Sequence, residues 1–535
     1  MRAKLLLIMI VILAAVLRFW QLPQLPPSLN WDEVSIGYNA ASILRTGRDE
    51  WGEFMPLTFR IYGDYKLPAY IYLTVPFVAL FGLNEWAVRL PSAILGVALV
   101  WLIFSLVKQW SEEKTALWAA FVAAVLPWPI ILSRIALEAQ LSLFLTTLGV
   151  YFFVRGVKSK YFLVFSAITF GLTIFSYNSS RIIIPLLVLS LGLIHYPQLA
   201  KYKKITVMSL VIFLTFFALA LPKALLQDSS ARYKWTTILD QGAINQINEL
   251  RGSSALPPPA VTLVYNKVTY FIPQVIQNYF SHFHPNFLFL NGGSNFQFSI
   301  PGIGLVYPLL LPFLIYGVFL FLKERKKWQW ITLMWLFFSF IPAAVTRDAP
   351  HALRSLTATV PLAFISAYAV AGLANQASRF KIGLNLIIIA GLLISLVLFW
   401  QNYSGSYRKN YSWAWQYGYK EAVEFIKKEG SNYHKIYLTK AYGEPHEFLL
   451  FYLPYDPAKY LSDPNLIRYF RSDWYWVDRF SKYYFLNDWE VKQKANCKET
   501  ERCLLITSPT NFDQGKLLQQ IKFLNGDPAF DIVEL

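Results

Sequence analysis

Long apolar segments separated by short polar loops recur along the first 400 residues of the chain. Apolar segments of roughly 17 to 25 residues are long enough to cross a bilayer as helices, and with residues 5–20 the sequence contains about eleven of them. The remaining segments are 90–107, 115–132, 139–154, 161–176, 182–198, 205–221, 301–322, 328–345, 355–373 and 382–400. This pattern predicts a mainly α, polytopic helical membrane protein.

Lysine and arginine are concentrated in alternate loops between these segments. The basic loops include "KYKK" at 201–204 and "KERKK" at 323–327. The positive-inside rule places them, with Arg2 and Lys4, in the cytoplasm. We therefore expect a multi-pass protein of the inner (plasma) membrane with a cytoplasmic N-terminus. Much of the net charge of +17 lies in these loops, where it orients the helices and meets anionic lipid headgroups. We therefore expect no nucleic-acid partner.

Composition agrees with a location in the lipid bilayer. Hydrophobic residues make up 55% of 535 positions and charged residues only 15%. A soluble domain carries about 25% charged residues. The first 20 residues, basic and then apolar, could also be a cleaved signal peptide. No small-residue cleavage site follows them, which favours a retained first span.

Residues 68–83, "PAYIYLTVPFVALFGL", form one further apolar segment. If this segment crossed the membrane, every later basic loop would lie outside, against the positive-inside rule. Its length of about 16 residues and the internal Pro76 are typical of an interfacial or re-entrant helix. We therefore expect the whole stretch 21–89 to be a first extracytoplasmic loop.

The chain divides near residue 400 into a membrane domain, 1–400, and a polar tail, 401–535. In the tail, "YKEAVEFIKKEG" has helical spacing, and "HKIYLTKAY" and "CLLITSP" are typical of short strands. We expect a small extracytoplasmic α/β domain there and a second large outer loop over 222–300. Cys497 and Cys503 both lie in the tail, where a disulfide and two free thiols are equally compatible with the sequence.

Ionisable residues collect at the predicted outer boundary of the membrane. Two adjacent carboxylates, Asp32 and Glu33, lie in "NWDEVSIGYNA" just after the first span. A cation at this boundary needs either a snorkelling role or an anionic partner, because it runs against the usual charge bias. The outer cations include Lys66, Arg134, Arg181, Arg347 and Arg354.

This grouping suits the transfer of a sugar from a lipid phosphate to a hydroxyl group. The hydroxyl needs one carboxylate to accept its proton, since an alcohol is a poor nucleophile. The leaving phosphate needs cations rather than an acid. One working carboxylate with several cations favours direct, inverting displacement, whereas a retaining reaction would use a second carboxylate as nucleophile.

Several motifs occur in an order that resembles a known family. "NWDEVSIGYNA", "GDYKLPAYIYL" and "LNEWAVRLPSAILG" are similar to the start of the GT-C membrane glycosyltransferases of glycosyltransferase family 39. This family includes the protein O-mannosyltransferases and the related aminoarabinose transferases. Lys66-Leu67-Pro68 stands where the family often shows Lys-Pro-Pro. Together with "SRIALEA", "SYNSSRIIIP" and "PHALRS", the resemblance covers roughly residues 15–360.

The resemblance implies a general-base role for Asp32, with Glu33 orienting the acceptor or the loop. It matches Lys66 to a lysine that meets the lipid phosphate, and Arg134 and Glu138 to an Arg and acidic residue after the third span. Arg354 and Arg181 are expected as further phosphate ligands, and Asp64 and His351 as supporting or acceptor-side groups.

Simpler structural roles are open for several of these residues. Asp32 could be only a helix N-cap, Glu33 could support the site from behind, and Glu138 could pair with Arg134 one turn away. Arg89 in "VRLP" is expected to pack structurally.

His282 and His284 in "SHFHP" are weak candidates for a divalent metal with Glu33 or Asp64. No cofactor is expected with certainty.

The partners expected are therefore a polyprenyl-phosphate sugar donor, the lipid bilayer and an acceptor hydroxyl on a protein, lipid A or a surface glycan. A transporter or lipid-linked oligosaccharide flippase is the main alternative. That class favours broken helices and polar groups at mid-membrane, whereas the ionisable groups here collect at the boundary. A glycan ligase on a similar helical scaffold is a second alternative.

Overall fold

The computed structural model describes residues 2–63, 65–226, 236–376 and 381–535, and the chain forms two compact units. The helical unit consists of Met1–Ala14, Gly96–Leu132 and Ala139–Val397. The mixed unit consists of Ala15–Leu95, Ser133–Glu138 and Leu398–Leu535.

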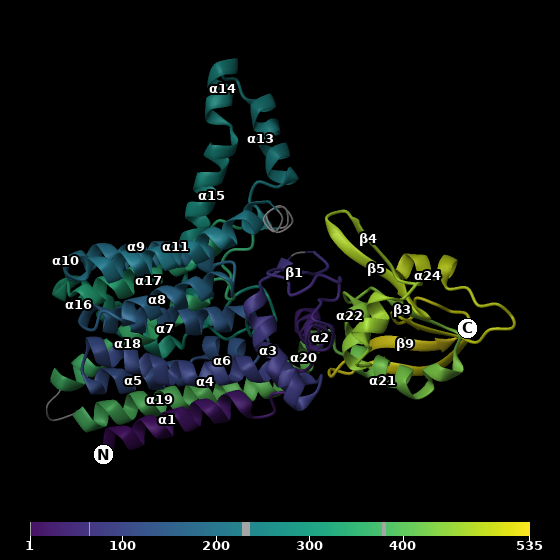
Figure 1. Ribbon diagram of the computed structural model, residues 1–535, viewed down its shortest axis with the longest axis horizontal. Coiled ribbons are helices and arrows are strands. Elements are labelled where there is room, and N and C mark those ends of the chain that lie inside the picture. Colours follow the sequence, from purple (N-terminus) through teal and green to yellow (C-terminus); the bar gives the residue numbers. More distant parts are fainter. Residues whose placement is uncertain (1, 64, 227–235, 377–380) are drawn as a thin grey trace. The chain divides into compact units, whose positions relative to one another are not determined.

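The helical unit is a bundle in which most helices run alongside one another (Figure 1). Its helices, several of which extend into the mixed unit, are α1 (Arg2–Phe19), α4 (Glu85–Trp110), α5 (Glu113–Val125), α6 (Pro127–Ser133), α7 (Glu138–Lys158), α8 (Phe162–Ile174), α9 (Ser180–Ile194), α10 (Tyr196–Lys201), α11 (Lys203–Leu226), α13 (Gln241–Ser253), α14 (Pro258–Val264), α15 (Lys267–Ser281), η1 (Asn286–Leu290), η2 (Pro308–Leu310), α16 (Leu311–Glu324), α17 (Lys327–Ala344), η3 (Leu356–Ala358), α18 (Thr359–Gln376) and α19 (Lys381–Gln401). The most extensive packing joins α8 to α11 and α5 to α18.

Helices occupy most of each segment predicted to span the membrane, which confirms a mainly helical polytopic membrane protein. Among the described residues, five helices are long and apolar enough to cross a bilayer alone. The bent pair α5 and α6, with 58° between its halves, adds a sixth if it counts as one span. The number of eleven crossings and the orientation of the chain stay predictions.

One predicted span differs in its bounds from the structure. The apolar segment 301–322 is helical only from Pro308, and α16 begins at Leu311. Gly304 lies so close to the backbone of Phe289 that a Cβ placed on it would be 2.2 Å from the Phe289 carbonyl carbon. Glycine has no Cβ and therefore permits this close approach between two chain segments.

The predicted outer loop 222–300 contains several helices in its described part. In Figure 1 the helices α13, α14 and α15 extend away from the bundle of the helical unit. One side of α15 exposes Val268, Ile272, Ile276 and Phe280, which recur at every fourth residue. This spacing places them on one face of an amphipathic helix.

The mixed unit begins with α2 (Trp31–Thr46), the two-stranded ribbon β1 (Phe59–Arg60) and β2 (Tyr65–Lys66), and α3 (Pro68–Phe81). The apolar segment 68–83 is thus a 14-residue helix that contains Pro76. Gly37 in α2 allows the ring of Phe451 to approach closely, since an added Cβ would lie 2.4 Å from Phe451 Cε2. A glycine at this position therefore permits direct packing of α2 on the tail of the same unit.

The polar tail contains a seven-stranded mixed sheet in the order β4-β5-β6-β3-β7-β9-β8. Strand β3 pairs in parallel with β6 and β7, and the other neighbours are antiparallel. The elements of the tail are η4 (Asn402–Tyr407), α20 (Arg408–Asn410), η5 (Ser412–Trp415), α21 (Tyr419–Glu429), η6 (Gly430–Asn432), β3 (Lys435–Thr439), α22 (Pro445–Tyr452), α23 (Pro457–Leu461), β4 (Ile467–Arg471), β5 (Trp474–Phe480), β6 (Tyr483–Leu486), α24 (Asp488–Lys494), β7 (Cys503–Thr507), β8 (Lys516–Lys522) and β9 (Pro528–Glu534). The sequence patterns correctly predicted α21, β3 and β7.

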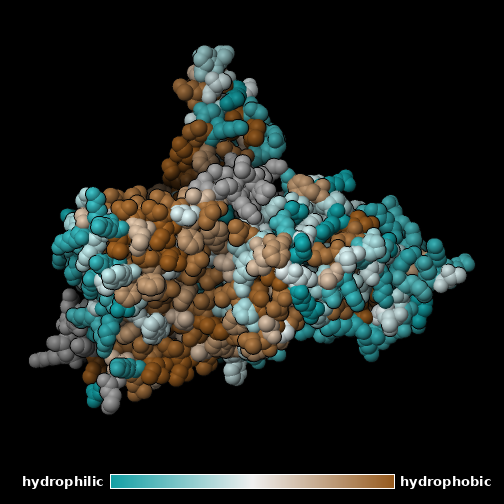
Figure 2. Space-filling view, viewed as in Figure 1, coloured by the Kyte–Doolittle hydropathy of each residue, from teal (hydrophilic) through white to brown (hydrophobic). Residues whose placement is uncertain are grey.

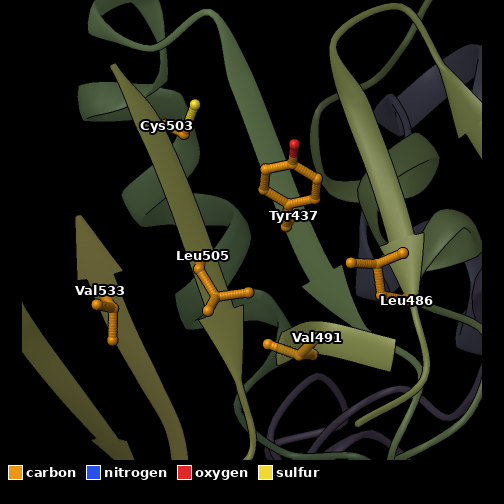
Figure 3. Close-up of a cluster of buried hydrophobic side chains, with 6 residues drawn as sticks. All are labelled: Tyr437, Leu486, Val491, Cys503, Leu505 and Val533. Atoms are coloured by element: carbon orange, nitrogen blue, oxygen red, sulfur yellow. The ribbon is translucent and has the colours of Figure 1, made fainter. Parts of the chain in front are cut away.

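Apolar side chains from four strands and one helix close the core of this sheet. Figure 3 shows Tyr437, Leu486, Val491, Cys503, Leu505 and Val533 in one cluster. Cys503 is fully buried there and forms a disulfide with Cys497, with 5.8 Å between the two Cα atoms. The structure thereby resolves the two possibilities that the sequence left open for these cysteines.

Reduction of the disulfide is expected to loosen the sheet around β7. A bridge that closes a loop this short contributes about 2 kcal/mol by restricting the unfolded chain. We expect faster hydrogen–deuterium exchange of the β7 amides when the full-length protein is reduced. The double variant C497A/C503A should exchange at one rate with and without reductant. Equal exchange in the oxidised and reduced wild type would contradict a stabilising bridge.

Candidate active site

Asp32 and Glu33 begin α2 but occupy different environments. The helix is capped by Asn30, whose side-chain oxygen accepts the Glu33 N–H at 2.9 Å, while the Asn30 N–H donates to Glu33 Oε2 at 3.2 Å. This reciprocal capping box makes Asn30, rather than Asp32, the N-cap. The Asp32 side chain is 28% exposed, whereas that of Glu33 is 0% exposed. Only Asp32 of the two carboxylates therefore reaches the surface.

Glu33 forms a bidentate ion pair with Arg89 inside the mixed unit. Arg89 Nε and Nη2 each donate to a Glu33 oxygen at 2.8 Å. Glu33 Oε1 also accepts the Ala136 N–H at 2.9 Å. Arg89 Nη1 in turn donates to the carbonyl oxygens of Leu22 and Pro26, both at 3.0 Å. A buried ion pair is tolerated when its remaining hydrogen-bonding positions are filled in this way.

Lys66 and Tyr62 both bind Oδ1 of Asp32. Lys66 Nζ lies 2.8 Å from this oxygen, and the Tyr62 hydroxyl donates to it at 2.6 Å. Lys66 Nζ also donates to the Asp32 carbonyl oxygen at 3.0 Å. Strand β2 positions Lys66 by pairing it with Phe59 of β1. The Asp32 carboxylate is therefore held in place by a cation and a hydroxyl.

Tyr62 is a site residue that sequence reasoning missed. It lies in "RIYGDYKLP", four residues before Lys66, in the same loop as the motif that carries the lysine. Its ring lies beside two indoles, with centroid distances of 5.4 Å to Trp31 and 5.4 Å to Trp474. An aromatic residue at this place has no recognisable spacing relative to Asp32, so the contact depends on the tertiary structure.

The protonation states of Lys66 and Tyr62 suit their contacts with Asp32. Burial alone would lower the pKa of Lys66, but the carboxylates of Asp32 and Glu138 outweigh it and raise the pKa. Burial raises the pKa of Tyr62 well above its ordinary value, and the Asp32 carboxylate adds to this rise. Lys66 therefore stays cationic and Tyr62 stays a hydrogen-bond donor at neutral pH.

Arg134 is fully buried in the mixed unit, and its guanidinium binds backbone carbonyl groups. Nη1 donates to Leu17 O at 2.8 Å and Nη2 to Trp20 O at 2.6 Å. Nε and Nη2 both donate to Leu25 O, at 3.1 and 2.8 Å. The cation also lies over the Trp400 ring, 5.4 Å from its centroid. These contacts organise the segment between α1 and α2.

Three further carboxyl groups, those of Glu50, Glu444 and Glu447, are buried in the mixed unit. Burial raises the pKa of Glu50 to about 8 and that of Glu444 to about 7. The pKa of Glu447 also lies well above its ordinary value, because of burial and of the charges on Glu50 and Glu444. The Glu447 charge is in turn among the influences that raise the pKa of Lys66.

The remaining candidates belong to the helical unit, except Asp64, which lies outside the described residues. Arg181 is half-buried at the start of α9. Arg354 Nη1 donates to Thr346 Oγ1 at 2.6 Å, and its Nη2 lies 3.7 Å from Asp348 Oδ2. The carboxylate pair, Lys66, Arg134 and Glu138 thus belong to the mixed unit, and Arg181 and Arg354 belong to the helical unit.

The histidines in the helical unit are used in local hydrogen bonds. His282 Nδ1 donates to Asn278 O at 2.8 Å, and its Nε2 accepts the His351 N–H at 3.2 Å. Burial lowers the pKa of His282 to about 4. His284 Nδ1 accepts the Asn286 N–H at 3.2 Å. Within the described part of the chain, no three His, Cys, Asp or Glu side chains gather as a metal site.

Residues 66–222 match the sequence model of the family described as dolichyl-phosphate-mannose-protein mannosyltransferase. The matched region includes Lys66, Arg134 and Arg181 and begins after Asp32 and Glu33. It is therefore shorter than the similarity over residues 15–360 expected from the motifs. A comparison with curated protein sequences finds no match.

Two solved structures of ArnT from Cupriavidus metallidurans are similar to this chain. The apo structure has 13% identity and a TM-score of 0.56, and the match covers 100% of this chain and 98% of ArnT. The structure of ArnT bound to undecaprenyl phosphate has 14% identity and a TM-score of 0.54, with 98% and 97% covered. At this level of identity the likeness concerns the fold.

The oligosaccharyltransferase of Archaeoglobus fulgidus, in complex with Zn and sulfate, is also similar in fold. It has 14% identity and a TM-score of 0.53, and the match covers 83% of this chain. This chain spans 61% of the length of that enzyme. The family match over 66–222 and the fold shared with ArnT confirm the resemblance to the PMT-like GT-C membrane glycosyltransferases that the sequence motifs indicate.

Proposed function

We propose that this chain is a membrane glycosyltransferase that moves a sugar from a polyprenyl-phosphate donor to an extracytoplasmic hydroxyl group, with inversion. The observation that carries the proposal is the part-exposed Asp32 carboxylate held 2.8 Å from Lys66. The family match beginning at Lys66 and the undecaprenyl phosphate bound by ArnT support the donor class. The acceptor is a protein, lipid A or a surface glycan.

Asp32 is assigned the role of general base. The acceptor hydroxyl loses its proton as it attacks the sugar, and a carboxylate within hydrogen-bond reach accepts that proton. Glu33 is unsuited to this role because both of its oxygens bind Arg89 inside the unit. With one reactive carboxylate from the pair, a single inverting displacement is favoured over a double displacement through a covalent intermediate.

Lys66 is assigned to the phosphate of the donor. A phosphate that binds Lys66 Nζ would lie near Asp32. The acceptor hydroxyl would give its proton to Asp32 and attack the sugar carbon on the face opposite the phosphate, and the polyprenyl phosphate would leave as an anion next to Lys66. Cations positioned where negative charge develops stabilise the transition state. Arg181 and Arg354 stay proposed as further phosphate ligands, with Glu138 and His351 as supporting groups. Arg134 is assigned a structural role, since its donors already bind carbonyl groups.

The location of the site outside the membrane is part of the proposal. The disulfide between Cys497 and Cys503 supports an extracytoplasmic tail, because disulfides persist in oxidising compartments. The tail belongs to the same compact unit as Asp32 and Lys66. The N-terminus is accordingly placed in the cytoplasm.

The Asp32→Asn variant is expected to lose transferase activity by about a hundredfold or more, in line with the loss of a general base. The measurement is release of polyprenyl phosphate from a panel of polyprenyl-phosphate sugars by purified protein in nanodiscs, with membrane extract as the acceptor source. Glu53→Gln is a matched control, because Glu53 lies in the same outer loop with its side chain 49% exposed. If no monophosphate donor releases product with the wild type, a flippase or a ligase of diphosphate-linked glycans replaces the proposal.

The Glu33→Gln variant is expected to be less stable than the wild type. It leaves the Arg89 guanidinium buried without a counter-charge, a change that typically costs about 3 to 5 kcal/mol. We expect a clear drop in the unfolding temperature in detergent. Asp32→Asn should give a smaller drop, because the Asp32 side chain is 28% exposed and an asparagine oxygen can still accept the hydrogen bonds of Lys66 and Tyr62. A Glu33→Gln protein with unchanged unfolding temperature and no activity would instead assign Glu33 to catalysis.

Because the pKa values of the buried carboxyl groups are raised, we expect the free energy of unfolding to fall as the pH rises from 6.5 to 8. The folded-state pKa of Glu50 is about 8, above its unfolded value. In this pH range Glu50 is therefore ionised in the unfolded chain and still protonated in the native state. As the pH rises, this difference favours the unfolded chain and lowers the free energy of unfolding. The pKa of His446 is lowered to about 3 by burial, so that its opposing effect ends below this window. Between pH 6.5 and pH 8, we expect the unfolding temperature of the wild type to fall about 4 °C more than that of Glu50→Gln. Parallel pH profiles for the two proteins would contradict a protonated Glu50.

A further inference from the structure

An apolar groove lies in the helical unit between α8, α9 and α11. Its volume is about 550 Å³, and α7 and α10 complete its walls. The apolar lining includes Leu163 and Phe170 from α8, Leu189 from α9, and Leu210 and Phe213 from α11. Leu189 and Leu210 are 59% and 48% exposed, so the groove opens on the surface of the bundle. In a membrane such a surface is filled by lipid chains.

Gly192 leaves the groove open on its α9 side. A Cβ placed on this residue would have no atom within 4 Å, and its backbone φ does not require glycine. The residue is also part of the groove lining. A larger side chain at this position would therefore occupy the groove without displacing its walls.

One lysine side chain lines the groove, and further lysines lie close to the lining residues in the sequence. Lys203 is part of its lining and is exposed at the start of α11. Lys201 and Lys204 are its close neighbours in the sequence, and Lys160 precedes the lining residue Leu163 by three positions. Figure 2 shows hydrophilic residues gathered at the end of the bundle where α10 lies, next to a largely hydrophobic side.

No acidic residue occurs in the sequence between Glu138 and Asp228. The helices that form the groove therefore supply no carboxylate near these lysines, except for Glu138 at the opposite end of α7 from Lys158. From a neighbouring element, Lys327 adds a further cation: its Nζ donates to Gln198 Oε1 of α10 at 3.2 Å. The mouth of the groove thus combines an apolar channel with an excess of positive charge.

We propose that this groove binds an anionic phospholipid of the bilayer, with an acyl chain along α8, α9 and α11 and the headgroup phosphate at Lys203. Acyl chains alone would not distinguish one lipid from another, because the lining is mostly apolar. The cluster of lysines selects the headgroup, since basic residues near a membrane surface attract anionic lipids. The site is separate from Asp32 and Lys66, which belong to the mixed unit.

The test measures lipid retention by the full-length protein in detergent with native mass spectrometry. The probes are phosphatidylglycerol and phosphatidylcholine with identical acyl chains. We expect one phosphatidylglycerol molecule to be retained at least about tenfold more strongly than phosphatidylcholine, as several cations contribute. The variant K203A/K204A should lose this preference, and Gly192→Leu should lose the retained lipid by filling the groove.

Two variants serve as matched controls. Lys323→Ala removes an exposed basic residue of α16 that does not line the groove. Gly383→Leu adds a side chain at an exposed glycine of α19, where a Cβ also meets no atom within 4 Å. Both should retain phosphatidylglycerol like the wild type.

Three results would overturn the proposal. Equal retention of the two phospholipids would remove the role of the lysines. Unchanged retention in Gly192→Leu, with a wild-type unfolding temperature, would place the lipid elsewhere. Displacement of phosphatidylglycerol by a lower concentration of undecaprenyl phosphate would change the occupant to a polyprenyl lipid.

Discussion

The buried ion pair between Glu33 and Arg89 is the interaction on which the candidate site depends. Removing two charges from water is costly, and the cost is offset only when both groups find complete sets of partners. Here the pair is bidentate, and the surrounding backbone supplies the other contacts: the N–H groups of Asn30 and Ala136 and the carbonyl groups of Leu22 and Pro26. The start of α2, the start of α4 and the segment after α6 are thereby held together.

This arrangement gives the two adjacent carboxylates different tasks. Consecutive residues of a helix point about 100° apart, so the first turn of α2 directs one carboxylate inward and the other toward the surface. Glu33 is committed to Arg89, and Asp32 meets Lys66 and Tyr62. The ion pair of Glu33 fixes the start of α2, and the part-exposed Asp32 is thereby held in one orientation. This suits a reaction in which the base must be oriented before the acceptor binds.

The cations predicted to lie at the outer boundary of the membrane show what the sequence could predict and what it could not. Their position against the charge bias predicted a snorkelling role or an anionic partner, and Arg134 instead binds neutral carbonyl groups. The partner itself is not local: Arg134 binds Leu17, Trp20 and Leu25, which lie more than a hundred positions earlier in the chain. Backbone carbonyl groups carry no sequence signal, so an arginine that binds them cannot be told apart by sequence from one that awaits a phosphate. Tyr62 was missed for the same reason.

The sequence by itself determined the helical membrane character, the helix positions, the α/β nature of the tail and the family resemblance, because apolar length, periodicity and motif order are local properties of the chain. Only the tertiary structure decided which carboxylate is exposed and which cation accompanies it. It also decided that the two cysteines are joined and that residues 21–89 and the tail form one compact unit. These features depend on contacts between residues distant in sequence, whose energies are set by burial and by the partners that folding brings within hydrogen-bond distance.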